Sequence, residues 1–132
     1  MTLALVTLAC GASGPATTGV STNDRIPSAD RVDQGTLARL EAEAKALAKT
    51  EGCARGEQCN AAPVGAKACG GPRYYLPYCP LTTDGRALVA KLDELRKAEE
   101  RYNRENGVVS TCELAAKPPL ESVNGVCRAR GR

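Results

Sequence analysis

The sequence predicts an α+β domain in which two helices pack on a small antiparallel sheet and disulfide bonds link the elements. Two segments carry apolar residues at helical spacing, and short segments with strand character lie between and after them. Six cysteines are spread between residues 53 and 127. A chain of 132 residues is long enough for one domain and short for two. We therefore assign residues 35–132 to a single disulfide-rich domain.

The first predicted helix covers residues 36–51 and stops at Gly52. Apolar residues recur along it three and four positions apart, as a helix face buried in a core requires: Leu37, Leu40, Ala44, Leu47 and Ala48. Its other positions carry charged side chains of both signs. This pattern is typical of a helix with one buried and one solvated face.

The second predicted helix covers residues 86–105. Thr83 or Asp84 precedes it as a cap, and Asn106-Gly107 closes it. Its apolar stripe consists of Leu88, Leu92, Leu95 and Tyr102. Charged residues cover the rest of the surface, which indicates a solvated outer face.

Four short segments are expected to be extended: 64–69, 73–79, 108–114 and 120–128. Asn124-Gly125 interrupts the last of them between two valines, which is a strong signal for a two-residue hairpin turn. Pro77 and Pro80 restrict the second segment to an edge strand or a strand-like loop, because proline has no backbone N–H to donate.

Disulfide bonds are expected because the chain has no Phe or Trp, and its core must consist mainly of Leu, Val and Ala. Three bonds would stabilise such a domain, and we expect Cys53–Cys59, Cys69–Cys112 and Cys79–Cys127. The alternative is reduced or metal-binding thiols. Thiolate metal sites usually contain C-x-x-C pairs or histidines, and the chain has neither. We therefore expect no metal and no cofactor.

The first ten residues, MTLALVTLAC, resemble the end of a bacterial lipoprotein signal peptide, in which the cysteine becomes lipidated. The resemblance implies a signal remnant over residues 1–9, a lipid anchor at Cys10 and membrane attachment through it. Residues 10–34 then form the anchor and a flexible tether rich in Gly, Ser, Thr and Pro. The alternative is an apolar N-terminal strand with a buried cysteine. The apolar run is too short to span a membrane.

Composition argues against several classes of function. The net charge of +3 is too small to indicate nucleic-acid binding. The chain has no His, so Ser–His and Cys–His catalytic pairs are excluded, and we expect no enzyme. Arg73, Tyr74 and Tyr75 follow a Gly-Gly-Pro turn and are the candidate partner-binding residues, because Tyr and Arg dominate interface hot spots. Alternatively the tyrosines are core residues, with Tyr74 and Tyr78 on one strand face and Leu76 off it.

The cysteine order and the segments PVGAKACGGPRYYLPY, ERYNRENG and NGVC resemble a family of small secreted or lipid-anchored bacterial proteins. The resemblance implies this fold and export, and it carries no activity. We expect a non-catalytic lipoprotein of the bacterial cell envelope, at the outer membrane or the periplasmic face, that binds a protein or a glycan. The alternative is an inhibitor of a hydrolase, a protease or lysozyme, with Arg73, Tyr74 and Tyr75 on the inhibitory loop.

Overall fold

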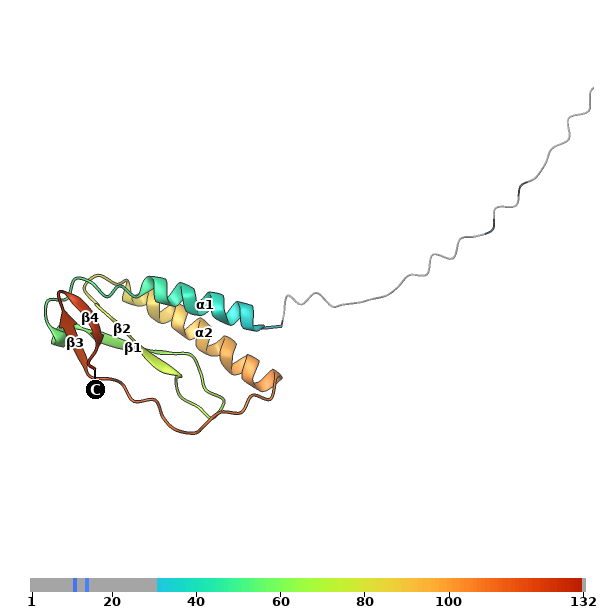
Figure 1. Cartoon of the computed structure of the whole chain (residues 1–132). Helices are drawn as coiled ribbons and strands as arrows, with labels where there is room; N and C mark the ends of the chain where they lie inside the picture. The colour runs from blue at the N-terminus through green and yellow to red at the C-terminus, as the bar shows by residue number, and fades with distance from the viewer. Residues whose placement is uncertain (1–10, 12–13, 15–30, 132) are drawn as a thin grey trace, which may run out of the picture.

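The computed structural model describes residues 11, 14 and 31–131. It confirms the predicted α+β class (Figure 1). Two helices lie side by side along one hairpin, and a second hairpin lies at one end of them. The elements follow in the order α1 Gln34–Leu47, a 3₁₀ turn Gly56–Gln58, β1 Asn60–Val64, β2 Tyr74–Tyr78, α2 Gly85–Glu105, β3 Leu120–Val123 and β4 Val126–Ala129. Among the described residues, neither helix is long and apolar enough to cross a membrane.

Helix α1 begins at Gln34, two residues before the predicted start, and ends at Leu47, before the predicted end at residue 51. The Asp33 carboxylate caps it by accepting a hydrogen bond of 2.7 Å from the Thr36 N–H. After Leu47 the chain becomes extended, because tertiary contacts replace the next helical hydrogen bonds. The Lys49 N–H donates to the Thr83 hydroxyl at 3.0 Å, and the Lys49 carbonyl accepts from the Cys79 N–H at 2.7 Å.

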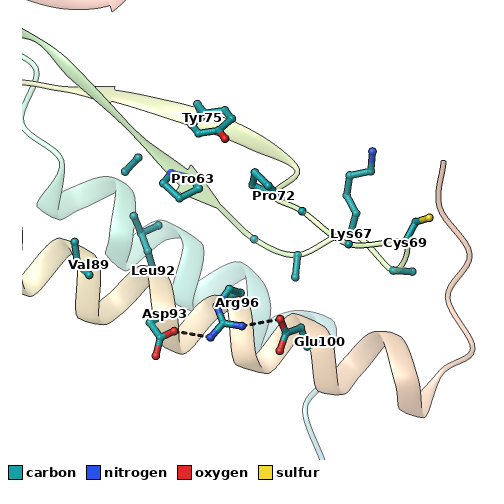
Figure 2. Close-up of a pocket in the computed structure, with 16 residues that line it drawn as sticks. Pro63, Lys67, Cys69, Pro72, Tyr75, Val89, Leu92, Asp93, Arg96 and Glu100 are labelled. Carbon is teal, nitrogen blue, oxygen red and sulfur yellow. Dashed lines mark hydrogen bonds and ion pairs between the residues drawn. The ribbon is translucent and has the colours of Figure 1, made fainter. Parts of the chain in front are cut away.

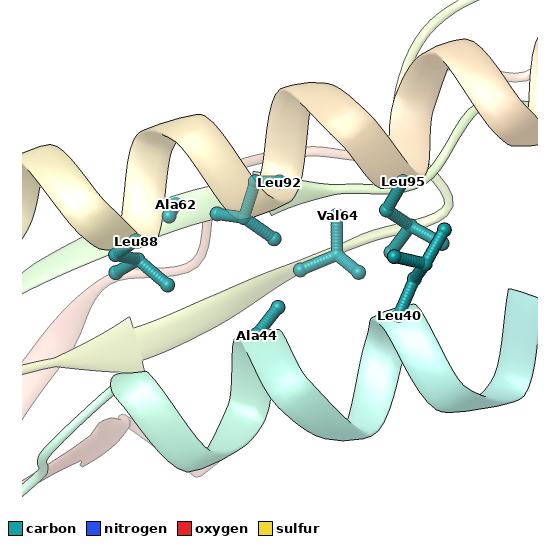
Figure 3. Close-up of a cluster of buried hydrophobic side chains, with 7 residues drawn as sticks. All are labelled: Leu40, Ala44, Ala62, Val64, Leu88, Leu92 and Leu95. Atoms are coloured by element: carbon teal, nitrogen blue, oxygen red, sulfur yellow. The ribbon is translucent and has the colours of Figure 1, made fainter.

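Helix α2 agrees closely with its prediction, with Asp84 as the capping residue. Its buried positions recur every three or four residues and pack against α1 and β1 (Figure 3). The core cluster consists of Leu40, Ala44, Ala62, Val64, Leu88, Leu92 and Leu95. Three half-buried residues of β2 pack against it: Tyr74, Leu76 and Tyr78. Leu76 therefore lies on the same face as the two tyrosines, as alternation along a strand requires, and its expected placement off that face is wrong.

Strands β1 and β2 form an antiparallel hairpin, and the first of them begins before the predicted segment 64–69. Residues 65–72 instead form the turn, and the Arg73 N–H closes it by donating to the Val64 carbonyl at 2.9 Å. In the register, Pro63 lies opposite Tyr75 and Pro77 lies opposite Ala61. In an antiparallel hairpin, every second pair of opposite residues exchanges backbone hydrogen bonds. Both prolines lie in the same alternate pairs of the register, so neither removes an N–H donor from the other pairs, which include Ala62 with Leu76.

Strands β3 and β4 form the predicted hairpin, with Asn124 at φ 51° and Gly125 at φ 78° in its turn. These left-handed conformations are those that a two-residue hairpin turn needs. The expected strand over residues 108–114 is wrong, because this segment has no strand partner and passes along the surface.

Three disulfide bonds are present: Cys53–Cys79, Cys59–Cys127 and Cys69–Cys112. The last confirms the prediction, and the expected bonds Cys53–Cys59 and Cys79–Cys127 are wrong. Backbone hydrogen bonds explain the difference. The Cys79 N–H bonds to the Lys49 carbonyl at 2.7 Å, which places Cys79 beside the segment that leads to Cys53. The 3₁₀ turn directs Cys59 towards the second hairpin instead.

The core predicts a sharp difference between two neighbouring residues of α2. Leu88 is fully buried and Val89 is 63% exposed. Leu88→Ala should lower the free energy of unfolding by about 2–5 kcal/mol, because it leaves a cavity among packed side chains. The matched control Val89→Ala should change it by less than about 0.5 kcal/mol. Urea denaturation followed by circular dichroism measures both, and equal losses would contradict the assigned core.

Candidate functional site

Arg73 joins both helices to the first hairpin. Its guanidinium lies between two carboxylates: Nη2 is 2.5 Å from Oε2 of Glu41 on α1 and 2.7 Å from Oε1 of Glu99 on α2. Nε donates a further hydrogen bond of 2.9 Å to Glu99. The Tyr74 hydroxyl donates to Glu41 at 2.6 Å, and the Ala66 N–H donates to the buried Glu99 carboxylate. We call Arg73, Tyr74, Glu41 and Glu99 the arginine cluster.

The turn after β1 needs a glycine beside this cluster. Gly65 has φ +75°, and a Cβ at this position would lie 2.6 Å from Nε of Arg73 and even closer to a Glu99 oxygen. A side chain here would therefore push the ion pair apart as well as strain the backbone.

Ionisation within the arginine cluster is set by competing effects. Burial alone would raise the pKa of Glu41, but hydrogen bonds from Tyr74, Arg73 and Lys45 outweigh it and bring that pKa to about 2. Burial, reinforced by the hydrogen bond to Glu41, raises the pKa of the Tyr74 hydroxyl. Burial opposes the charge on Arg73, and its bonds to Glu99 and Glu41 nevertheless raise the pKa of the guanidinium. The cluster thus contains ion pairs and a neutral tyrosine around neutral pH.

A groove of about 760 Å³ lies between α2 and the first hairpin (Figure 2). Leu92 and the exposed Val89 line it from α2, and Pro63 and Tyr75 line it from the hairpin. The turn over residues 65–72 forms its end wall. We call this site the α2–hairpin groove. Its volume lies within the usual range for ligand sites.

Charged side chains along the α2 side of the groove pair with one another. Arg96 contacts Asp93 and Glu100, each at 2.7 Å (Figure 2). Lys97 also contacts Asp93 at 2.7 Å. These pairs neutralise the rim, so the groove offers apolar walls and little net charge.

Tyr75 is the one aromatic residue that lines the groove. Its ring lies on the strand face opposite to Tyr74, because successive side chains alternate. Within residues 31–131, none of the hydrogen bonds involves its hydroxyl. Tyr75 therefore presents both an apolar ring and a free polar group to anything that enters the groove.

The structure separates the residues that the sequence grouped together. Arg73 and Tyr74 belong to the arginine cluster, whereas Tyr75 belongs to the α2–hairpin groove. Their part in partner binding stays a prediction, and Cys10 lies outside the described residues. Sequence reasoning missed the groove itself. Val89 was the available signal, since it is an apolar residue next to the predicted stripe of α2 and outside it.

The sulfur atoms of Cys53, Cys59 and Cys127 lie within 4.8 Å of one another. A group of thiolates at this spacing could bind a soft metal ion. All three are paired in disulfide bonds, so their sulfurs are not available as thiolate ligands in this form of the protein.

Comparison of the chain with models of protein families, with curated proteins and with solved structures finds no match. The assignment of function therefore rests on the geometry of the groove and on the sequence pattern.

The arginine cluster predicts a specific dependence of stability on pH. The pKa of Glu41 is lowered from 4.5 to about 2 in the fold. Its ionised form therefore stabilises the protein fully at pH values above the pKa of the unfolded chain, and this contribution is lost as the pH falls towards about 2. Solvent screens part of the interaction. We therefore expect Glu41→Gln to lower the free energy of unfolding by about 1–2 kcal/mol near neutral pH.

The difference between wild type and Glu41→Gln should shrink as the pH falls from 4.5 towards about 2. Glu94→Gln is the control, since Glu94 forms an exposed ion pair with Lys91, and it should have almost no effect. Denaturant titrations over this pH range measure both. A constant difference at all pH values would contradict the role of the Glu41 charge.

Proposed function

We propose that this chain is an exported, lipid-anchored and non-catalytic protein of the bacterial cell envelope that binds an apolar segment of a protein partner in the α2–hairpin groove. The observation that carries the proposal is the groove itself, with its exposed Val89 and its free Tyr75 hydroxyl. Three disulfide bonds are typical of oxidising compartments and support export. The apolar run that ends at Cys10 supports the anchor.

Binding is favoured over catalysis because the carboxylates at the groove and in the arginine cluster are held in ion pairs. A general acid or base must be free to reach a substrate proton. In the part of the chain that the structure describes, Asp93 and Glu100 pair with Arg96 at the groove, and Glu41 and Glu99 pair with Arg73 in the arginine cluster. These carboxylates are engaged in contacts that hold the fold and its rim together.

A protein partner is favoured over a glycan by the chemistry of the walls. A glycan needs many hydrogen-bonding groups, whereas Val89, Leu92 and Pro63 offer none on their side chains. An apolar peptide segment gains by covering such a surface, and tyrosine is among the residues that dominate protein interfaces.

Inhibition of a hydrolase, the other function that the sequence suggests, receives less support. An inhibitory loop must present its anchor side chain to the enzyme. The Arg73 guanidinium instead lies between Glu41 and Glu99, and the Tyr74 hydroxyl bonds to Glu41.

The groove predicts which surface substitution weakens binding of the partner. Full-length protein in detergent should capture a partner from envelope extract, and Val89→Asp should weaken that interaction by about tenfold or more, because it places a charge on an apolar wall. Leu81→Asp is the matched control: Leu81 is 67% exposed, Val89 is 63% exposed, and Leu81 does not line the groove. Titration of the identified partner measures both. Equal affinities of the two variants would refute the groove as the binding site.

The anchor predicts that Cys10 carries fatty acid. A gene that includes the sequence upstream of the first codon is expressed with a fatty-acid analogue, and the wild type should incorporate label that Cys10→Ser lacks. The six other cysteines remain in both proteins and serve as an internal control. Equal labelling of both proteins would show that Cys10 is not the site of acylation.

A further inference from the structure

Residues 107–119, which we call the strap, follow α2 and lead to β3 without forming regular secondary structure (Figure 1). The strap is attached to the turn that forms the end wall of the α2–hairpin groove. The Cys69–Cys112 bond links the two covalently, and the Cys69 N–H donates to the Ser110 hydroxyl at 3.0 Å. The Lys67 ammonium also donates to the Glu113 carbonyl. The bond at Cys112 is therefore the one covalent attachment between strap and wall.

The three disulfide bonds differ strongly in their access to solvent. Cys53 and Cys79 are 0% exposed, Cys127 is 2% exposed, and its partner Cys59 is half-buried. Cys69 and Cys112 are both exposed. Thiol–disulfide exchange requires a thiolate to reach a sulfur atom, so exposed bonds exchange and enclosed ones resist. The difference in burial directs a soluble thiol to Cys69–Cys112.

Opening this bond would affect the wall more than the core. Cys69, Gly70 and Gly71 line the groove, and the two glycines have φ +108° and +78°. Glycine at such positions leaves the turn free to change conformation once its covalent attachment is lost. Within residues 31–131, the buried core cluster includes no residue of the strap. The strap can thus separate from the wall while the two helices and the first hairpin remain packed.

We propose that Cys69–Cys112 is a thiol-exchange site, and that a dithiol reductant which opens it frees the strap and the 65–72 wall of the groove. One thiolate of the dithiol attacks the sulfur of one cysteine, forms a mixed disulfide, and releases the other cysteine as a thiolate that takes up a proton. The second thiolate of the reductant then attacks the reductant sulfur that is bonded to the protein in the mixed disulfide. This step releases the remaining cysteine, and the reductant becomes a cyclic disulfide after the transfer of two electrons.

Graded dithiothreitol, added to the folded full-length chain, tests the exchange directly. After quenching by alkylation, peptide mapping should show Cys69 and Cys112 modified about tenfold or more faster than the buried Cys53, Cys79 and Cys127 and the half-buried Cys59. Modification of all six together, or of either of the pairs Cys53–Cys79 and Cys59–Cys127 first, would overturn the proposal.

Release of the strap has its own readout. Glu113 lies in the strap beside Cys112, so a glutamate-specific protease should cut after it about tenfold faster once the bond is open. Amide hydrogen exchange of residues 65–72 should accelerate by a similar factor while α2 keeps its protection. The double variant Cys69→Ser with Cys112→Ser should reproduce both effects without reductant. If the double variant shows the same cleavage rate and the same amide exchange as the wild type, opening of this bond does not release the wall.

The consequence for binding rests on the proposed function. If the groove binds a protein segment, the double variant should bind the captured partner about fivefold or more weakly, because the wall is no longer held in place. Equal affinity would overturn control of the groove by this bond. Failure of the wild type to capture any partner, together with selective reduction and strap release, would instead refute the proposed function and leave the exchange site supported.

Discussion

The Arg73 guanidinium lies between one carboxylate from each helix, and the first hairpin takes its place in the fold from this contact. Such a cluster is costly to bury, because Glu99 and part of Arg73 lose water. Several donors offset this cost: the guanidinium, the Ala66 N–H and the Tyr74 hydroxyl together satisfy the two carboxylates. An apolar contact could slide between α1 and α2, whereas this set of hydrogen bonds allows one arrangement. Directional bonding thus supplies the specificity that a core of small side chains does not.

The two ends of the domain are held by different chemistry. The arginine cluster joins the helices to the turn between β1 and β2. At the other end, Cys53–Cys79 joins the segment after α1 to the end of β2, and Cys59–Cys127 joins the start of β1 to β4. Between them lies a core of Leu, Val and Ala alone. Such side chains bury less area than aromatic ones.

Elements defined by local patterns could be predicted, and elements defined by tertiary contacts could not. The apolar spacing gave both helices, and Asn124-Gly125 gave the second hairpin. The end of α1 depends on Lys49, whose backbone bonds to residues more than 25 positions away. The sulfurs of Cys53, Cys59 and Cys127 lie within 4.8 Å of one another in the fold. Spacing along the chain therefore could not show which of these cysteines form disulfide bonds with each other. The groove arises where Val89, off the buried stripe, comes to lie opposite Tyr75, and only the packing of the hairpin on α2 brings them together.

The positions of Pro63 and Pro77 in the first hairpin bear on how the protein behaves when it is crowded. A ribbon of two strands has two outer edges, and each could pair with a strand of another molecule. The prolines lie opposite Tyr75 and Ala61, on the alternate set of positions, and therefore provide no N–H there. The Ala61 N–H is already bonded to the Asn60 side chain at 2.8 Å. Copies of this domain brought side by side would thus find no continuous row of donors on β1, and pairing of this strand with a strand of another copy is disfavoured by the covalent structure of β1 itself.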